Sequence, residues 1–134
     1  MKVLAIAGSL REQSYNRGLV RAAQALAPAG MEIIAADISA IPLYNGDEDG
    51  DNRPDSVTAL AEQVKSADAL LFATPEYNYS IPGVLKNAID WLSRVPGGIF
   101  AGKAAAIMGA SMGGMGTSRS QYHLRQVLVF LDVH

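Results

Sequence analysis

The sequence has no cysteine, few charged residues and no long apolar run. Without cysteine, the 134-residue chain has no disulfide framework, no thiolate metal site and no cysteine nucleophile, which fits a reducing compartment. The 11 Lys and Arg residues nearly balance the 13 Asp and Glu residues, so nothing indicates a basic nucleic-acid surface. No stretch approaches the roughly 18 apolar residues that cross a bilayer. We therefore expect a cytoplasmic protein with no membrane or nucleic-acid partner.

Metal-binding patterns are also missing. His123 and His134 lack the spacing of a paired ligand set, and we predict no metal site. The acidic run at 47–52 has the alternating acids of a calcium loop, but Asn52 stands where that loop needs glycine and Thr58 where it needs glutamate. We expect this run to be a solvated acidic loop.

Two kinds of segment alternate along the chain, which has the length of a single domain. Apolar runs without polar alternation predict strands covered on both faces, and apolar residues at helical spacing predict helices between them. The expected strands are Lys2–Ala7, Glu32–Ala36, Ala69–Ala73 and Lys103–Met108, and the expected helices are Asn16–Leu26, Ser56–Lys65, Pro82–Ser93 and Ser118–Leu131. This order predicts an α/β fold with a doubly wound parallel sheet, whose ligands bind beyond the carboxyl ends of the strands.

The first of the loops at those ends is Gly8–Asn16, with the sequence GSLREQSYN. It lies between a strand and a helix, where backbone N–H groups and the helix dipole favour an anion. Its serines and asparagine can donate hydrogen bonds, and Arg11 brings a permanent charge. Neither GxxxxGK[ST] nor GxGxxG occurs, so a terminal monophosphate suits the first loop better than ATP. The alternative is a helix N-cap at Ser14 or Asn16, with Arg11 solvated.

Two further loops lie at the same expected edge. The third loop, Thr74–Gly83, reads TPEYNYSIPG, and its two prolines and two tyrosines could form a stiff wall for a flat ring. Local packing of Tyr77 and Tyr79 is the alternative for this loop. The fourth loop, Gly109–Ser118, holds four glycines, which either bring backbone donors close to a ligand or form a mobile lid. Trp91, at helical spacing, is more typical of core than of a cofactor contact.

The motifs in these loops resemble the NADPH-dependent FMN reductase family. GSLRxxSxN at Gly8–Asn16, PEYNxSIPGxLKNAIDWLSR at Pro75–Arg94 and ASMGGMG at Ala110–Gly116 carry the resemblance, which is strongest to bacterial chromate and quinone reductases of flavodoxin-like fold. It covers essentially the whole chain. It implies noncovalently bound FMN, NADPH or NADH as electron donor, and a homodimer or homotetramer.

The resemblance also assigns the cofactor-binding residues. It places the phosphate loop, the flavin-ring loop and a further flavin contact on the same three loops. The residues implied are Ser9, Leu10, Arg11, Ser14, Tyr15 and Asn16 for the phosphate, Pro75, Glu76, Tyr77, Asn78 and Tyr79 for the ring, and Ser111 with Gly113 and Gly114 for the further contact. Glu76 is expected to reach the ring edge through its main chain. Tyr122 and Arg125 face either a subunit partner or solvent.

The function implied is two-electron reduction of quinones, chromate and azo or nitro compounds by NAD(P)H, in a ping-pong hydride mechanism. No catalytic side chain is expected, because the flavin carries the redox chemistry. We expect the backbone N–H groups around Ser111–Gly114 to stabilise charge on the reduced ring. A flavodoxin-like electron carrier without its own substrate is the alternative, although a net charge of −2 is low for such a carrier. A third hypothesis is a domain that binds and senses a nucleotide without turnover.

The sequence departs from the family pattern at its C-terminal end. Members of the family usually continue with a fifth strand and a closing helix, whereas the sequence ends at VLVFLDVH (Val127–His134). We expect a single flavodoxin-like FMN-binding domain over residues 1–134 without that last strand and helix. We favour an incomplete chain as the explanation, and the alternative is a shortened form. Such a form would leave the edge of the fourth strand open.

Overall fold

The computed structural model describes residues 1–134 and contains one parallel sheet. Its strands are β1 (Lys2–Ala7), β2 (Glu32–Ala36), β3 (Ala69–Ala73) and β4 (Ala104–Met108), in the spatial order β2-β1-β3-β4. The order reverses between β1 and β3, because the chain moves outward to β2 and then returns to the other side of β1. Such a reversal opens a crevice at the carboxyl ends of the strands, where α/β proteins bind ligands.

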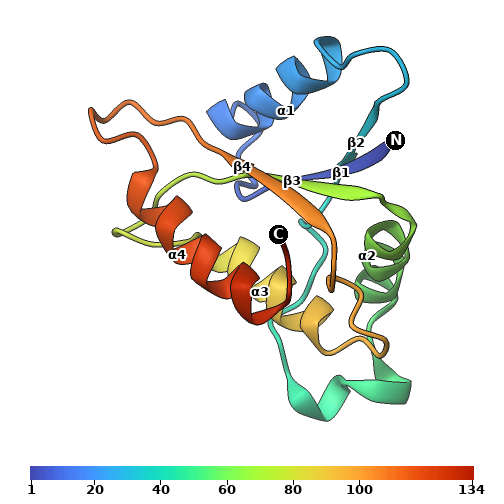
Figure 1. Ribbon diagram of the computed structural model, residues 1–134. Coiled ribbons are helices and arrows are strands. Elements are labelled where there is room, and N and C mark those ends of the chain that lie inside the picture. The colour runs from blue at the N-terminus through green and yellow to red at the C-terminus, as the bar shows by residue number, and fades with distance from the viewer.

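Helices lie on both faces of the sheet, as expected for a doubly wound fold. They are α1 (Tyr15–Ala25), α2 (Asp55–Ser66), α3 (Gly83–Ser93) and α4 (Ser118–Phe130), and two 3₁₀ turns, η1 (Gly46–Glu48) and η2 (Gly50–Asn52), precede α2. Figure 1 shows α1 above the sheet and α2, α3 and α4 below it. None of these helices combines the length and the apolar character needed to cross a bilayer.

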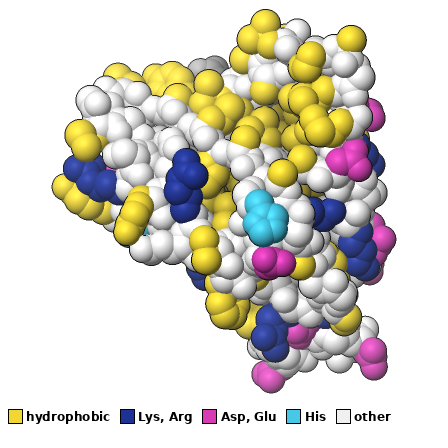
Figure 2. Space-filling view, viewed as in Figure 1, with side chains coloured by type: hydrophobic (Ala, Val, Ile, Leu, Met, Phe, Trp, Pro, Cys, Tyr) yellow, Lys and Arg dark blue, Asp and Glu magenta, His cyan; other side chains and the backbone are white.

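The two faces of the sheet are covered unequally. The main core, with Leu4, Phe72 and Leu85 at its centre, lies between the sheet and α2, α3 and α4. The core under α1 has only Ala5, Val20 and Ala73 as fully buried members. In Figure 2, hydrophobic side chains gather in the hollow between α1 and β4, over the part of the sheet that α1 leaves open. One half of this face therefore lacks a helical cover.

The last residue pairs with the outer edge of β4. The Ala105 N–H donates to the His134 carbonyl at 2.7 Å, and the His134 N–H donates to the Lys103 carbonyl at 2.9 Å. This pattern is a parallel bridge beside Ala104. From Ala106 to Met108 that edge has no neighbouring strand.

The predicted α/β fold is confirmed, and the boundaries of its elements agree within one residue. Three predicted strands match as written, and the fourth begins at Ala104 instead of Lys103. The predicted range of the third helix began at Pro82. The helix begins at Gly83, and Pro82 is its N-cap. The 3₁₀ turns η1 and η2 fall in the acidic run at 47–52, which is exposed as expected apart from half-buried Asp49.

Candidate functional site

The first, third and fourth loops meet around one open cavity at the carboxyl edge of β1, β3 and β4. The cavity has a volume of about 210 Å³ and is lined by Ser9, Arg11, Ser14, Tyr15, Asn16, Pro75, Glu76, Tyr77, Ala110, Ser111 and Met112. Gly8 allows the first and third loops to approach, because a Cβ there would lie 3.1 Å from Leu85 Cδ2 and 3.3 Å from Pro75 Cδ. Loops that are distant in sequence thus form one site.

The first loop offers hydrogen-bond donors to this cavity. Ser14 caps α1, since its Oγ accepts from the N–H groups of Asn16 and Arg17 at 3.2 and 3.4 Å. Its hydroxyl hydrogen is free to donate outward. The Ser9 hydroxyl and the Leu10 N–H have no hydrogen-bond partner within the chain. Although Ser9 as a residue is only 6% exposed, its hydroxyl oxygen is not itself buried. Unsatisfied donors at a helix N-terminus are the chemistry that a phosphate needs.

Arg11 stands at the rim of the cavity. Its Nη2 donates to the Gln13 carbonyl at 2.9 Å, and its guanidinium carbon lies 5.5 Å from the centre of the Tyr15 ring. It forms no ion pair with an acidic side chain of the chain. Its charge is therefore uncompensated beside the donors of the first loop, and its guanidinium lies over the ring of Tyr15, which is 52% exposed.

Asn16 ties the first loop to the fourth. Its Nδ2 donates to the Ala110 carbonyl at 3.1 Å, and its Oδ1 accepts from the Ala110 N–H at 3.0 Å. The side chain is buried, and the residue is 2% exposed. Both polar groups of the amide take part in this contact, so the geometry gives Asn16 a role in holding two loops in register, and the second hydrogen of Nδ2 is not used in it.

The third loop presents two tyrosines on a tight turn. Tyr77 and Ser80 exchange two backbone hydrogen bonds of 3.1 Å, and the residues between them, Asn78 and Tyr79, have φ values of 50° and 68°. A positive φ is common for asparagine but uncommon for tyrosine, so the turn holds Tyr79 in a strained conformation. Tyr77 and Tyr79 are 50% and 65% exposed, and the Arg119 guanidinium lies 3.8 Å from the Tyr79 ring centre.

Glu76 joins the third loop to the beginning of α4. Its Oε2 accepts from the N–H groups of Arg119 and Ser120 at 2.9 and 3.2 Å, and its Oε1 accepts from Arg119 Nη1 at 3.2 Å. Burial raises the pKa of Glu76, but these hydrogen bonds and the Arg119 charge together lower it below its usual value. Thr117, the N-cap residue of α4, makes no side-chain cap, so Glu76 caps the helix from the neighbouring loop. The carboxylate is thus structural, and Glu76 as a residue lines the cavity.

The fourth loop is held close to β3 and folds around its own serine. A Cβ on Gly109 would lie 1.9 Å from Thr117 Oγ1 and 2.5 Å from the Thr74 carbonyl oxygen, so only glycine fits there. Ser111 Oγ accepts from the Gly113 N–H at 3.1 Å and donates to the Gly116 carbonyl at 2.9 Å. The N–H groups of Ser111, Met112 and Gly114 find no acceptor in the chain. The donors of this loop are therefore backbone groups.

Every site residue predicted from the sequence lies on one of the three loops, and most of them line the cavity. Leu10, Asn78, Tyr79, Gly113 and Gly114 lie in the same loops without lining that cavity. Ala110 and Met112 line it and were not predicted. Trp91 is fully buried and donates to the Pro42 carbonyl at 2.9 Å, so its assignment to the core is confirmed. No group of three or more His, Cys, Asp or Glu side chains is placed to hold a metal ion.

Comparison with known proteins agrees with this geometry. The model of the NADPH-dependent FMN reductase family matches residues 1–134. An NAD(P)H-dependent FMN reductase of Pseudomonas aeruginosa is 62% identical over 134 residues, which are 100% of the chain and 72% of that protein. A quinone reductase of Escherichia coli K12 is 52% identical, over 98% of the chain and 71% of its own length.

A solved structure gives the same result for the fold. FerB, a flavoenzyme NAD(P)H:(acceptor) oxidoreductase from Paracoccus denitrificans, superposes with a TM-score of 0.92 at 39% identity, over 98% of the chain and 72% of FerB. The fold is therefore flavodoxin-like, as predicted. The match to the family model over the whole chain and the identity of these relatives lead to one assignment. The chain belongs to the NADPH-dependent FMN reductase family and is an oxidoreductase with FMN as cofactor and NAD(P)H as electron donor.

Proposed function

We propose that the chain reduces quinones with NAD(P)H, using FMN bound between the first, third and fourth loops. The observation that carries this proposal is the convergence of the three loops on one cavity, where hydrogen-bond donors have no partner within the chain. The Escherichia coli relative is named a quinone reductase, and this name supports the choice of acceptor. Bound FMN would supply the redox chemistry, which is hydride transfer from the nicotinamide and then hydride transfer to the quinone, with one proton from solvent completing the hydroquinone.

The residues present fit FMN. A terminal phosphate is suited by the hydroxyls of Ser9 and Ser14, the free N–H groups of the first loop and the Arg11 charge. Tyr77 and the main chain of Glu76 suit one side of a flat ring. Asn16 holds the fourth loop so that its backbone donors lie opposite the third loop. In this proposal the phosphate end supplies affinity, and the other two loops set the electronic surroundings of the ring.

The fourth loop is proposed to stabilise negative charge during reduction. The N–H groups of Ser111, Met112 and Gly114 have no acceptor in the chain, whereas that of Gly113 is held by Ser111 Oγ. Fixed backbone donors stabilise a developing anion without reorganisation at the moment of reaction. The Ser111 hydroxyl is proposed to keep these donors in place by closing the loop on itself.

The cavity is open to solvent on the side of exposed Tyr77 and Met112. A donor and an acceptor are proposed to use this open face in turn, which gives ping-pong turnover. An open face discriminates weakly among acceptor molecules of different shape. Chromate and azo or nitro compounds are therefore proposed as further acceptors. We also propose a homo-oligomer in the cytoplasm. Exposed apolar side chains on α4, among them Val129 and Phe130, support the assembly.

The experiment is a spectrum of the purified protein during reduction. We expect a yellow protein, or one that becomes yellow with added FMN, whose absorbance is bleached by NADPH without oxygen and restored by one equivalent of benzoquinone. If bleaching requires a separate reductase, the chain is an electron carrier and not a reductase. A colourless protein that does not take up FMN would overturn the proposal.

A further inference from the structure

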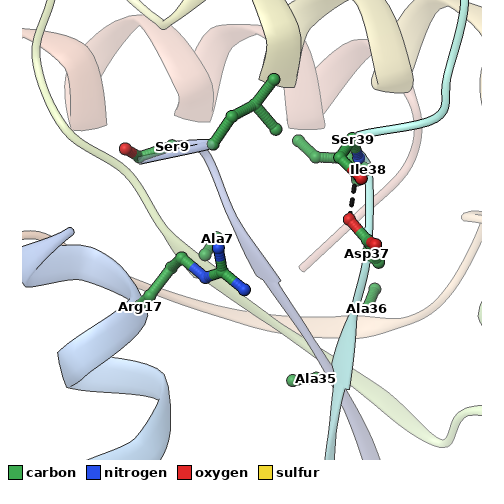
Figure 3. A pocket seen from close by; sticks show the side chains of 9 residues that line it. Ala7, Ser9, Arg17, Ala35, Ala36, Asp37, Ile38 and Ser39 are labelled. Atoms are coloured by element: carbon green, nitrogen blue, oxygen red, sulfur yellow. Dashed lines mark hydrogen bonds between the residues drawn. The ribbon is translucent and has the colours of Figure 1, made fainter. Parts of the chain in front are cut away.

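A second cavity lies directly beside the phosphate loop, on the opposite side from the proposed ring site. It has a volume of about 210 Å³ and lies at the carboxyl ends of β1 and β2. Ser9 lines both cavities, so the two are neighbours. In Figure 3 the Ser9 hydroxyl points away from Asp37, which leaves the polar chemistry of the second cavity to Arg17, Asp37 and Ser39.

Arg17 brings a positive charge to this cavity from α1. It lies in the first turn of α1, where the helix dipole disfavours a cation, and that turn contains no acidic residue. Its guanidinium forms no ion pair within the chain. In Figure 3 it reaches over Ala7, at the end of β1, into the cavity. The helix dipole disfavours this cation, and the only charge that it is seen to influence is that of Asp37 in the same cavity, so its guanidinium is available to a ligand.

Asp37 faces the same cavity from the end of β2. Its Oδ1 accepts the Ser39 N–H at 2.9 Å, as Figure 3 shows. Hydrogen bonds from Ser39, the backbone N–H first, lower the pKa of Asp37, and the Arg17 charge lowers it further. The carboxylate is therefore ionised at neutral pH and can accept hydrogen bonds from hydroxyl groups. Leu10 and Ile38 add apolar walls.

We propose that this cavity binds the adenosine end of the nicotinamide donor, with Asp37 accepting from the ribose hydroxyls and Arg17 against the adenine or a 2′-phosphate. A guanidinium plane between apolar walls suits a purine, and a carboxylate at the end of the second strand suits a ribose diol. The inference rests on the proposed function, because the nicotinamide must lie at the flavin ring near β3 and β4. That position is about two strand spacings away, or about 10 Å, which a dinucleotide spans.

Donor preference follows from the two charges. A 2′-phosphate is attracted by Arg17 and repelled by Asp37, whereas a ribose diol uses Asp37 as an acceptor. Asp37→Asn is therefore expected to raise the ratio of kcat/KM for NADPH to that for NADH by about fivefold, and Arg17→Ala to lower it by about fivefold, as expected for exposed charges at contact distance. Arg21→Ala is the matched control, because it removes the same charge one turn further along α1.

The test combines this ratio with a direct binding measurement. Calorimetry on the FMN-loaded protein with 5′-AMP and adenosine 2′,5′-bisphosphate is expected to show binding of both. Asp37→Asn should increase the affinity for the bisphosphate relative to that for AMP, and Arg17→Ala should decrease it. Arg21→Ala should leave both affinities within twofold of the wild-type values. Equal effects of Arg17→Ala and Arg21→Ala, or an unchanged preference in Asp37→Asn, would overturn the inference, as would a wild-type protein that binds neither nucleotide.

Failure of this inference is distinguishable from failure of the proposed function. The FMN absorbance of each sample and its bleaching by NADPH report the proposed function alone. A protein that is yellow, is bleached by NADPH and lacks the expected changes in donor preference contradicts only the adenosine site. A protein that takes up no FMN contradicts the proposed function itself.

Discussion

Replacing Asn16 with alanine tests how the site is held together. Asn16 makes two hydrogen bonds to the backbone of Ala110, across 94 residues of sequence, and it is 2% exposed. Each such hydrogen bond contributes about 1 kcal/mol, so Asn16→Ala is expected to lower the free energy of unfolding by about 2 kcal/mol. The fourth loop also loses its tie to the first loop. FMN must then order this loop on binding, and we expect its dissociation constant to rise about tenfold.

Asn87 offers a matched control for this variant. Its Nδ2 donates to the Pro42 carbonyl at 2.7 Å, and its Oδ1 accepts from the Tyr44 N–H at 2.8 Å. It thus ties a distant loop to α3 in the same way, away from the residues that line the proposed FMN cavity. Asn87→Ala should lose similar stability in urea denaturation, and its FMN affinity in a fluorescence titration should match that of the wild type. Equal FMN affinities for the two variants would refute the idea that Asn16 organises the site.

Three further predictions concern single positions. Arg11→Ala should raise the FMN dissociation constant at least tenfold and leave turnover at saturating FMN within twofold; a large loss at saturation would contradict a phosphate-binding role. Gly109→Ala should destabilise the fold by about 3 kcal/mol in urea denaturation, because its Cβ would lie 1.9 Å from Thr117 Oγ1, whereas Gly114→Ala, in open space, should not. The lowered pKa of Glu76 means that its stabilisation is present above the usual value of 4.5 and is lost as the pH falls below it. Glu76→Gln should flatten that acidic dependence of stability, and an unchanged pH profile would contradict its capping role.

The elements of the fold could be predicted closely from the sequence because their signals are local. Each strand is a short apolar run, and Ser14 marks the start of α1 by its capping chemistry. The expectation that all four strands are covered on both faces was wrong for β2 and β4, which have no buried residue because they lie at the two edges of the sheet. The 3₁₀ turns η1 and η2 were missed, since single turns of helix have no periodicity to detect. Pro82 was placed one residue too far into α3 because proline is equally suited to a position just before a helix.

The three loops that meet at the cavity could be predicted from the sequence, but not the contacts among their residues. The topology of a parallel sheet brings the loops after its strands to one edge, so the three loops could be identified from their order alone. Asn16 and Glu76, however, bond to groups 94 and more than 40 residues away. No local pattern reports such a bond. Their roles in holding loops together become visible only when the strands have fixed which loops are neighbours.

The most direct test of the proposed site is an FMN titration followed by backbone amide NMR shifts. We expect the largest changes at residues 9–16, 75–79 and 110–114, with saturation at one equivalent of FMN. Amides between α3 and α4, where a separate groove includes Ile89 and Phe130, should change little. Large shifts confined to that groove, or no shifts in the fourth loop, would contradict a single FMN site built from the three loops.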